Sequence, residues 1–355
     1  MSYDGTFTQS AIRKSMRHED ARRFHLNRST MTTSNLSQSN RRSFLKSSLT
    51  LAACAGMNPA DVFAKQEEMD TAYFQHHRKF LNVDQGRIAY VEKGRGPVAL
   101  FLHGFPLNGY QWRGALERLN KLRRCIAPDL MGMGYSEIQE SVTINPDTQV
   151  DMLVSFLDRL SIRDVDLVAN DSGGLVAQIF IARIPGRIKS LLISNCDVDE
   201  NNPPKQFLPA VSLAKKHLFA EKYIAPQLGN LQVARSARGI GASYTYPDRL
   251  AEATIEYYFC PLVSSPARIA QLDSYTVSMG VNLLVPLRES LQQWAGPVRI
   301  LWGAKDTFFG VEWAQWLNHN LRNSKDVRSL DNANLFFPEE MPEVIAEEAE
   351  ALWRI

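Results

Sequence analysis

The stretch LVANDSGGLVAQ, residues 167–178, has residue types that suit the presentation of a nucleophile on a tight turn. Where a strand reverses sharply into a helix, the residues two before, two after and three after the nucleophile must be small, because larger side chains would collide. With Asp171 as the nucleophile, three small residues fill these positions: Ala169, Gly173 and Gly174. With Ser172, two of the three positions hold larger residues. The spacing therefore predicts that Asp171 is the nucleophile.

The elements that must position this turn alternate along the chain from Phe80 onward. Strands are expected within RIAYVEKG, PVALFLHG, RRCIAPDL, DVDLVAN, IKSLLISNCDV, GPVRILWG and DVRSLD. Helical spacing appears between them, as in residues 175–183 before Pro185 and Gly186, and in the closing helix with Ile345, Ala349 and Leu352. Such alternation predicts an α/β fold with a mostly parallel sheet flanked by helices.

The alternation breaks between one strand and the next, where the chain becomes helical and aromatic, as in QFLPAVSLAKKHLFAEKYIAP. We interpret this insertion as a helical lid (cap) over the carboxyl edge of the sheet. The expected organisation is an N-terminal extension at 1–64, the first part of the core at 72–198, the lid at 199–290, and the second part of the core at 291–355.

Four motifs occur in order along the chain: HGFPLNGYQWR from His103, PDLMGMGYSE from Pro128, the turn ANDSGG, and LWGAKDTFF from Leu301. With them, residues 80–353 resemble proteins of the α/β-hydrolase fold, in the branch that contains epoxide hydrolases and haloalkane dehalogenases. The resemblance implies an aspartate nucleophile that attacks an sp3 carbon to form an alkyl-enzyme ester. It implies no cofactor and no metal.

The resemblance also implies roles for the residues around Asp171. Backbone N–H groups of Phe105 and Ser172 would form the oxyanion hole for hydrolysis of the ester. His103 and Gly104 would be structural parts of the loop after an early strand. Asp306, after a late strand, occupies the place of the acid that orients a catalytic histidine. Two further polar residues end an earlier strand, where some relatives place an alternative acid: Asn195, which cannot carry charge, and Asp197, the reserve.

The sequence departs from the family pattern at the catalytic histidine. In LDNANLFFPEEMPE, Asn334 and Leu335 align with the expected glycine and histidine, and no histidine follows His319. Without a base to activate water, an ester on Asp171 should stall, because general bases typically contribute about 10²- to 10⁴-fold. Three explanations stay open: a substitute base such as His217 in the lid, a non-hydrolytic lyase or isomerase that uses Asp171 as a base, and a non-catalytic protein that binds small ligands.

Residues tied to specificity also differ from the dehalogenases. The resemblance places a halide-holding Trp after the nucleophile and a donor after the first HG, where this chain has Ser172 and Phe105. Lid tyrosines protonate the opening ring in epoxide hydrolases, and six are available: Tyr223, Tyr244, Tyr246, Tyr257, Tyr258 and Tyr275. The sequence thus predicts a hydrolase for a small apolar electrophile, epoxide before alkyl halide before ester.

The N-terminal extension has the composition of an export signal. Residues 1–64 hold 9 Lys and Arg against 4 Asp and Glu, whereas the whole chain has 40 against 38, so the body is slightly acidic and nucleic-acid binding is not indicated. Arg41 and Arg42 precede a short apolar run and a small-residue cleavage site ending at Ala64. This resembles a twin-arginine signal read by the twin-arginine export machinery, with a periplasmic address. Cys54 in LAAC is an alternative lipid anchor, and no transmembrane span is expected.

Overall fold

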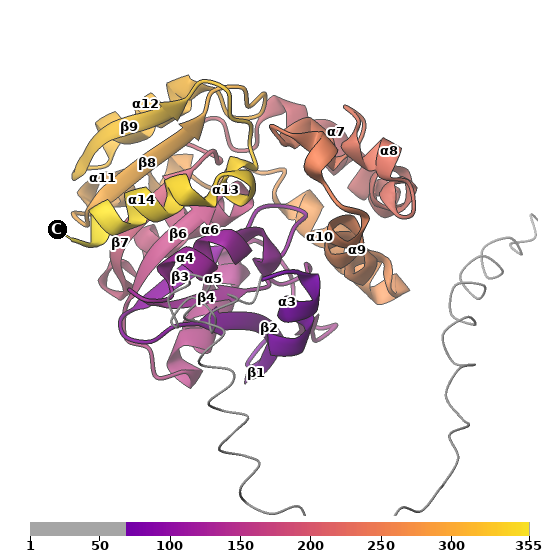
Figure 1. Ribbon diagram of the computed structural model, residues 1–355, viewed down its shortest axis with the longest axis horizontal. Helices are drawn as coiled ribbons and strands as arrows, with labels where there is room; N and C mark the ends of the chain where they lie inside the picture. Colours follow the sequence, from indigo (N-terminus) through magenta and orange to yellow (C-terminus); the bar gives the residue numbers. More distant parts are fainter. Residues whose placement is uncertain (1–68, 355) are drawn as a thin grey trace, which may run out of the picture. The chain divides into compact units, whose positions relative to one another are not determined.

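A computed structural model describes residues 69–354 of the chain, and the predicted export signal with Arg41, Arg42 and Cys54 lies outside them. Nine strands form one sheet in the order β1-β2-β4-β3-β6-β7-β8-β9, with β5 paired to β2 (Figure 1). The strands are β1 (Lys79–Val83), β2 (Gly86–Lys93), β3 (Val98–Leu102), β4 (Arg124–Pro128), β5 (Glu137–Ile138), β6 (Val165–Asn170), β7 (Ile188–Ser194), β8 (Val298–Gly303) and β9 (Ser324–Leu330).

The sheet is parallel from β4 to β9, and only the β2 pairings with β1, β4 and β5 are antiparallel. The central strands β3, β6 and β7 consist almost entirely of buried residues, as is typical of parallel strands covered on both faces. The predicted α/β-hydrolase architecture, a mostly parallel sheet flanked by helices, is confirmed.

The helices of the core follow from right-handed crossovers between parallel strands. From β3 to β4 the chain moves toward one edge of the sheet, and from β4 through β6 to β9 it moves toward the other edge. The helix between β3 and β4 therefore lies on one face of the sheet, and the helices that connect the later strands lie on the opposite face. Helices α4 and α14 pack against each other, while α6 packs against α5 and α11. The helices are α3 (Thr71–His77), α4 (Arg113–Leu119), α5 (Pro146–Arg159), α6 (Ser172–Arg183), α11 (Arg288–Gln293), α12 (Val311–Asn320), α13 (Phe337–Glu340) and α14 (Pro342–Trp353).

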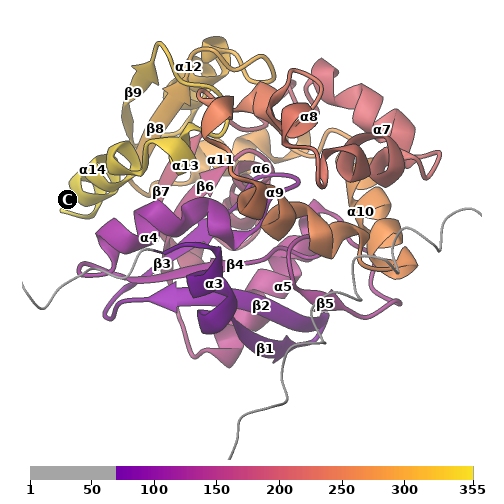
Figure 2. The ribbon, with the colours of Figure 1, turned by 45° about the vertical axis from the view of Figure 1, so that its right-hand side comes forward.

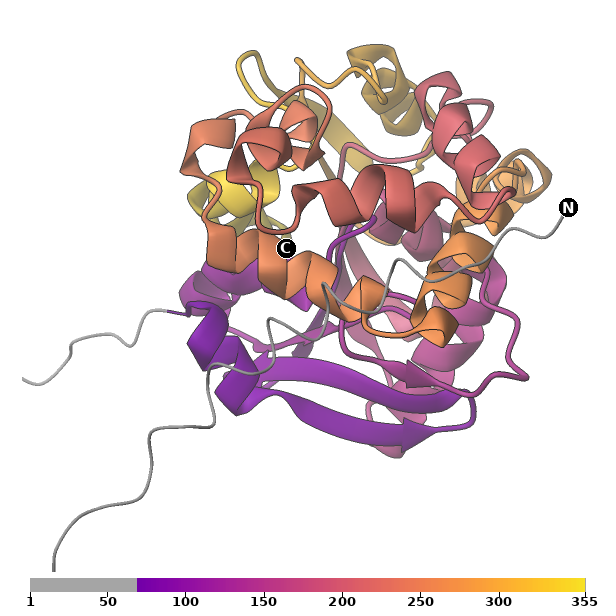
Figure 3. The ribbon, with the colours of Figure 1, turned by 90° about the vertical axis from the view of Figure 1, so that its right-hand side faces the viewer.

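Between β7 and β8 the described chain forms helices and turns but no strand of the sheet. The main helices are α7 (Leu208–Ala214), a π-helical turn (Ala220–Ile224), α8 (Leu231–Arg235), α9 (Glu252–Phe259) and α10 (Pro266–Ser278). Figures 2 and 3 show α7 to α10 grouped together on one side of the sheet. We keep the name lid for residues 199–290. Within residues 69–354, no helix is both long enough and apolar enough to span a membrane.

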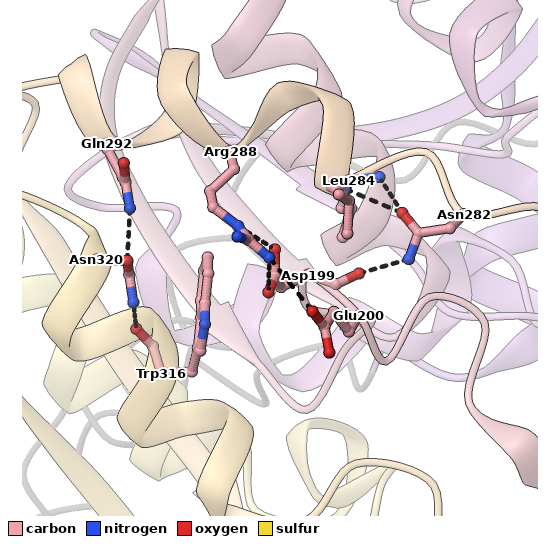
Figure 4. A network of polar contacts seen from close by, with 9 residues as sticks. Asp199, Glu200, Asn282, Leu284, Arg288, Gln292, Trp316 and Asn320 are labelled. Carbon is pink, nitrogen blue, oxygen red and sulfur yellow. Dashed lines mark hydrogen bonds and ion pairs between the residues drawn. The ribbon is translucent and has the colours of Figure 1, made fainter.

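A polar network joins the two ends of the lid (Figure 4). The carboxylate of Asp199, at the start of the lid, accepts hydrogen bonds from Arg288 Nε at 2.8 Å and Arg288 Nη2 at 2.6 Å. Asn282 Nδ2 donates to the Asp199 carbonyl at 2.7 Å. Asp199 is buried, with a φ of 48°. The chain therefore leaves and re-enters the core at one point, which fixes where the lid sits above the sheet.

A buried carboxylate ties the lid to the C-terminal part of the core. Glu339 Oε1 accepts a hydrogen bond from Arg113 Nη1 at 2.6 Å. Glu339 Oε2 accepts from two lid hydroxyls, Tyr244 at 2.6 Å and Tyr258 at 3.0 Å. The Glu339 side chain is only 3% exposed. Three buried groups, Glu339 and the two tyrosine hydroxyls, and the partly exposed Arg113 thus satisfy one another across three segments of the chain.

We expect Glu339→Ala to lower the free energy of unfolding by about 1–3 kcal/mol for each of the two buried hydroxyls, Tyr244 and Tyr258, that lose their acceptor. Arg113 is partly exposed and keeps the Tyr110 carbonyl at 3.3 Å as an acceptor. The matched control is Glu343→Ala. Glu343 is 55% exposed and lies 3.8 Å from Arg118, and such surface pairs contribute about 0–1 kcal/mol. Urea unfolding of both variants measures the effect. Equal losses in the two variants would contradict this account.

Candidate active site

Asp171 occupies the sharp turn between β6 and α6. Its φ of 54° and ψ of −130° are outside the regions that non-glycine residues normally adopt, and such backbone conformations cost about 1–3 kcal/mol. The Asp171 N–H donates to the Asn195 carbonyl at 2.7 Å, which anchors the turn to the end of the neighbouring strand β7. Strained, well-anchored turns of this kind occur at functional sites, where the surrounding structure holds one side chain in place.

The two glycines after the turn are needed for space. A Cβ on Gly173 would lie 2.2 Å from the carbonyl oxygen of Leu102, and a Cβ on Gly174 would lie 2.4 Å from the Cβ of Cys196. Both distances are far below van der Waals contact, so no other residue fits without backbone movement. The small residues that the turn requires are therefore where the sequence analysis placed them for a turn centred on Asp171.

The Asp171 carboxyl faces the two backbone donors expected to form an oxyanion hole. Ser172 N–H donates to Asp171 Oδ1, and the N–H of Phe105 also contributes as a donor to this carboxyl. Burial nevertheless raises the pKa of Asp171 well above its usual value, and the negative charges of Asp197 and Asp306 raise it further. The structure thus brings Asp171, Ser172 and Phe105 together, with two more carboxyls close by.

His103 lies below the site, fully buried. Its Nε2 accepts a hydrogen bond from the Leu130 N–H at 2.9 Å, so its Nδ1–H donates to the Gly104 carbonyl at 2.9 Å. Burial lowers the pKa of His103 to about 4, which keeps the ring neutral near pH 7. His103 is not among the residues that line the cavity described below. His103 therefore connects the loop after β3 to the loop after β4, as expected for a structural residue.

A chain of buried amides links the loop after β3, the nucleophile turn and the loop after β9. Gln111 Oε1 accepts from the Gly104 N–H at 2.8 Å, and Gln111 Nε2 donates to Asn170 Oδ1 at 2.7 Å. Asn170 Nδ2 then donates to the Leu335 carbonyl at 3.1 Å. Asn170, the residue before Asp171, therefore helps to fix the position of Leu335. The sequence analysis did not identify Gln111, since nothing in its local pattern separates it from a surface residue.

Asp306 is buried behind the site and has no histidine partner. Its Oδ2 accepts from Asn195 Nδ2 at 2.9 Å, and its Oδ1 accepts from the Phe308 N–H at 2.8 Å. Asn195 Oδ1 in turn accepts from the Gly303 N–H at 2.7 Å. Burial raises the pKa of Asp306 to about 6. Asn195 thus joins the Asp306 carboxyl to the end of β8.

A cavity of about 250 Å³ lies between the sheet edge and the lid. Asp171, Ser172 and Asp197 contribute polar groups from the core, and Gln206, Tyr223 and Ser243 contribute them from the lid. The remaining lining is mostly apolar and aromatic: Phe105, Pro106, Pro204, Phe207, Pro209, Ala210, Leu213, Phe219, Ile240, Met279, Phe308, Phe309, Leu335 and Phe336. Such a lining suits a small apolar molecule with one reactive polar centre.

Among the residues that line the cavity within the described chain, none is a histidine. Leu335 is 3% exposed, and its side chain faces the cavity at the position aligned with the family's histidine. The substitute proposed from the sequence, His217, is not there: its side chain is 79% exposed and its Nδ1 lies 3.3 Å from Asp273 Oδ2. A φ of 56° at His217 turns the chain at the end of α7 and leaves the ring outside the cavity. The prediction that His217 hangs over the site does not agree with this geometry.

Of the six lid tyrosines, only Tyr223 lines the cavity. Burial raises its pKa to about 12, and its ring stacks on Phe219 at 5.3 Å between centroids. Tyr275 is fully buried behind Phe105, with ring centroids 6.2 Å apart, and its hydroxyl has no hydrogen-bond partner. Tyr244 and Tyr258 bind Glu339, as described above, and the Tyr257 hydroxyl accepts from Arg78 at 2.7 Å.

Asp197 is the cavity residue whose importance the sequence analysis underrated. It follows β7 by three residues, is 6% exposed, and lines the cavity with Asp171. Asn202 Nδ2 donates to Asp197 Oδ1 at 3.0 Å. Burial raises the pKa of Asp197 to about 7. Within residues 69–354, no group of three or more His, Cys, Asp and Glu side chains is arranged to hold a metal ion. The spatial pairing of Asp197 with Asp171 depends on neighbouring parallel strands, which local sequence patterns do not specify.

The raised pKa values make stability depend on pH in a defined direction. The folded pKa values of Asp197, about 7, and Asp306, about 6, exceed their usual value of 3.8. Between about pH 4 and pH 7 the folded protein therefore binds more protons than the unfolded chain, so the free energy of unfolding falls as the pH rises. His103, whose pKa is lowered, acts in the opposite direction between about pH 4 and 6.5.

We expect the double variant Asp197→Asn/Asp306→Asn to remove the contribution of these two carboxyls and to leave those of His103 and of the other buried carboxyls, such as Asp171. Thermal unfolding at pH 5 and pH 8 measures the difference, and the wild type should lose more stability over this interval than the variant. The same change in both proteins would show that neither carboxyl has the raised pKa inferred from its burial.

The comparisons with known proteins agree with this architecture. A family model described as alpha/beta hydrolase fold matches residues 97–340. A haloalkane dehalogenase of Mesorhizobium japonicum is 43% identical over 105 residues, which cover 29% of this chain and only 34% of that relative. A cis-3-alkyl-4-alkyloxetan-2-one decarboxylase of Shewanella oneidensis is 27% identical over 259 residues, 68% of this chain and 79% of that relative.

Among solved structures, the epoxide hydrolase CorEH superposes with a TM-score of 0.63 at 20% identity, and the alignment covers 78% of this chain and 98% of that one. At this identity the likeness concerns the fold. Because the family model covers more than half of the chain, this chain belongs to the alpha/beta hydrolase fold family.

Proposed function

We propose that the protein is an exported hydrolase that acts on a small apolar electrophile, an epoxide ahead of an alkyl halide or an ester, with Asp171 as the nucleophile. The observation that carries the proposal is the position of the Asp171 carboxyl. It stands on a strained turn, beside two backbone N–H donors, at the wall of a cavity that is otherwise mostly apolar.

The reaction would proceed in two halves. In the first, the Asp171 carboxylate attacks an sp3 carbon and forms an alkyl ester. In the second, water attacks the ester carbonyl, and the N–H groups of Phe105 and Ser172 stabilise the negative charge that develops on the carbonyl oxygen. The aromatic walls exclude bulk water, which strengthens the interaction of each of these two N–H groups with the negative charge.

The polar groups around the cavity favour an oxygen leaving group over a halide. A halide ion is stabilised by N–H donors, and the two positions expected to hold such donors are Ser172 and Phe105, whose side chains have no N–H group. An epoxide oxygen instead requires a proton as the ring opens. Hydroxyl or carboxyl donors suit this need, and the cavity wall provides Tyr223 and Asp197.

One observation favours a second candidate function, a lyase that does not hydrolyse its substrate. Leu335 faces the cavity where a histidine base would activate water, and a reaction that breaks a bond by proton transfer or decarboxylation requires no such water. The relative from Shewanella oneidensis is named a decarboxylase of an oxetanone, a strained ring. Under this alternative Asp171 acts as a base or transient nucleophile, and no oxygen from solvent enters the product.

Export is part of the proposal and rests on the N-terminal sequence. Arg41 and Arg42 with the apolar run that follows are read as a twin-arginine signal, cleaved near Ala64, with acylation of Cys54 as the alternative. Replacing both arginines by lysine should retain the protein in the cytoplasm of the producing bacterium. N-terminal sequencing of the exported form distinguishes cleavage at Ala64 from processing at Cys54.

The test of the enzymatic proposal is intact-mass analysis of residues 65–355 after incubation with styrene oxide, 1,2-epoxyhexane and 1-bromohexane, together with product assays. Formation of diol or alcohol, or an adduct that maps to Asp171, supports the proposal. Absence of both with every compound contradicts it and favours the lyase, which an oxetanone probe would then reveal.

A further inference from the structure

Hydrolysis of the ester on Asp171 needs a base that activates water. Among the described residues that line the cavity, Asp197 is the other carboxyl besides Asp171. Asp197 and Asp171 line the same cavity from the ends of two adjacent parallel strands, β7 and β6. A backbone hydrogen bond holds the two loops together: the Asp171 N–H donates to the carbonyl of Asn195, two residues before Asp197. The charge of Asp197 is the strongest electrostatic influence of any side chain on Asp171.

We propose that Asp197 is the acid–base residue of this site: it gives its proton to the ring oxygen of an epoxide as Asp171 attacks, and then takes a proton from the water that hydrolyses the ester. The inference rests on the proposed function, with Asp171 as the nucleophile. It narrows the substrate class to strained cyclic ethers, whose leaving oxygen needs that proton.

The surroundings of Asp197 fit this role. Its carboxyl is held by Asn202, whose Oδ1 accepts from the Leu283 N–H at 2.7 Å, so the group is fixed by the returning end of the lid. Ser172 Oγ, also in the cavity wall, is buried, makes no hydrogen bond within residues 69–354 and lies near the Tyr275 hydroxyl, so it is available to a water or substrate oxygen in the cavity.

Several titratable groups lie near the two carboxyls. Cys196 and the Tyr275 hydroxyl lie near both Asp171 and Asp197, whereas Asp306 and the Tyr223 hydroxyl lie near Asp171. Within residues 69–354, neither Asp171 nor Asp197 forms an ion pair with a Lys or Arg side chain. Two carboxyls in one buried site without a counter-ion cannot both ionise readily, so one proton remains between them near pH 7.

The proton balance closes over one cycle. The first step starts from the form in which the shared proton lies on Asp197 and Asp171 is ionised: the Asp171 oxygen bonds to carbon, the C–O bond of the ring breaks, and the Asp197 proton moves to the ring oxygen. In the second step the Asp197 carboxylate takes one proton from water, and the hydroxide adds to the Asp171 carbonyl carbon. The tetrahedral intermediate then collapses: the bond between the Asp171 carbonyl carbon and the diol oxygen breaks, and the diol oxygen takes the second proton of that water. Asp171 is again ionised and Asp197 again protonated.

Two probes separate the acid role from the base role in Asp197→Asn. With 1-bromohexane the leaving bromide needs no proton, so in the wild type Asp197 must release its proton to solvent after the ester forms and before it acts as the base. The Asp197→Asn variant should release about one equivalent of bromide and accumulate the hexyl ester on Asp171. Its turnover should fall by about 10²- to 10⁴-fold relative to the wild type. With styrene oxide, ester formation itself should slow by a similar factor, because the ring oxygen has lost its proton donor. Glu200→Gln, a carboxylate-to-amide change at a side chain that is 76% exposed, is the matched control and should behave as the wild type.

The outcomes distinguish failure of this inference from failure of the proposed function. Wild-type turnover with both probes and an unchanged Asp197→Asn variant would overturn the role of Asp197 while leaving Asp171 as the nucleophile. A wild type that accumulates the ester on Asp171 without turnover would also overturn the role of Asp197 and leave Asp171 as the nucleophile, because no base would then act on the ester. Absence of both adduct and product in the wild type would overturn the proposed function and this inference with it. Loss of the bromide burst in Asp197→Asn would also overturn the inference, since bromide release needs only Asp171.

Discussion

Asp171→Asn is expected to lower product formation by about 10⁴-fold or more, with no adduct on the chain. Removing a covalent nucleophile leaves only the binding and electrostatic contributions of the site, and losses of this size or larger accompany such changes in enzymes with a nucleophilic residue. The amide has nearly the shape of the carboxyl and can still accept the N–H groups of Phe105 and Ser172. The variant should therefore fold, and intact mass together with product assay measures the effect.

The control for Asp171→Asn is His217→Ala. The His217 side chain is 79% exposed and lies outside the cavity lining, so its removal should leave activity unchanged. Full activity in Asp171→Asn would show that chemistry takes place elsewhere or through another group. Loss of activity in His217→Ala would restore it as the missing base and would require the lid to adopt another arrangement.

Leu335→His should restore turnover when it is introduced into Asp197→Asn. A histidine at 335 would face the cavity from the loop after β9, which is joined to the Asp306 loop by a hydrogen bond from the Lys305 N–H to the Ala333 carbonyl at 2.9 Å. Histidine is close to leucine in volume, so the cavity wall should change little. If the stalled step lacks only a base, the double variant should regain about 10²- to 10⁴-fold in hydrolysis of the ester on Asp171.

The matched control for this rescue is Asp197→Asn/Leu335→Asn, which introduces a polar side chain without a titratable nitrogen. It should stay as slow as Asp197→Asn. The pH profile provides a second readout, because activity that depends on an imidazole base falls below about pH 6.5. Equal recovery with asparagine would mean that polarity or added water, rather than a base, limits the reaction.

The sequence was sufficient to predict the fold class, because the alternation of apolar runs and amphipathic stretches is local and the crossovers follow from handedness. The strand segments around β2, β3, β4, β6, β7, β8 and β9 were all expected, whereas β1, the short β5 and α3 were not assigned. The turn geometry could also be predicted at residue level. Small residues at 169, 173 and 174 reflect a steric requirement that the positions of Leu102 and Cys196 now explain.

The cavity could be predicted only in part, because it depends on contacts between distant segments. The sequence indicated that Leu335 replaces a histidine, and the structure places Leu335 at the cavity wall. It did not indicate where His217 would point, since a single positive φ at the end of α7 decides this. It named Asp197 only as the reserve for an alternative acid, because the burial of Asp197 beside Asp171 and its hydrogen bond with Asn202 depend on the fold.

The most direct test of Asp171 as a covalent nucleophile is turnover of styrene oxide in water labelled with oxygen-18, followed by proteolysis and mass analysis of the peptide that contains Asp171. Hydrolysis of an ester at the carboxyl carbon inserts a solvent oxygen into Asp171, and the product of the first turnover carries an unlabelled oxygen from the protein. The account predicts label in the Asp171 carboxylate after several turnovers. Diol that carries label from the first turnover, with none in Asp171, would contradict it.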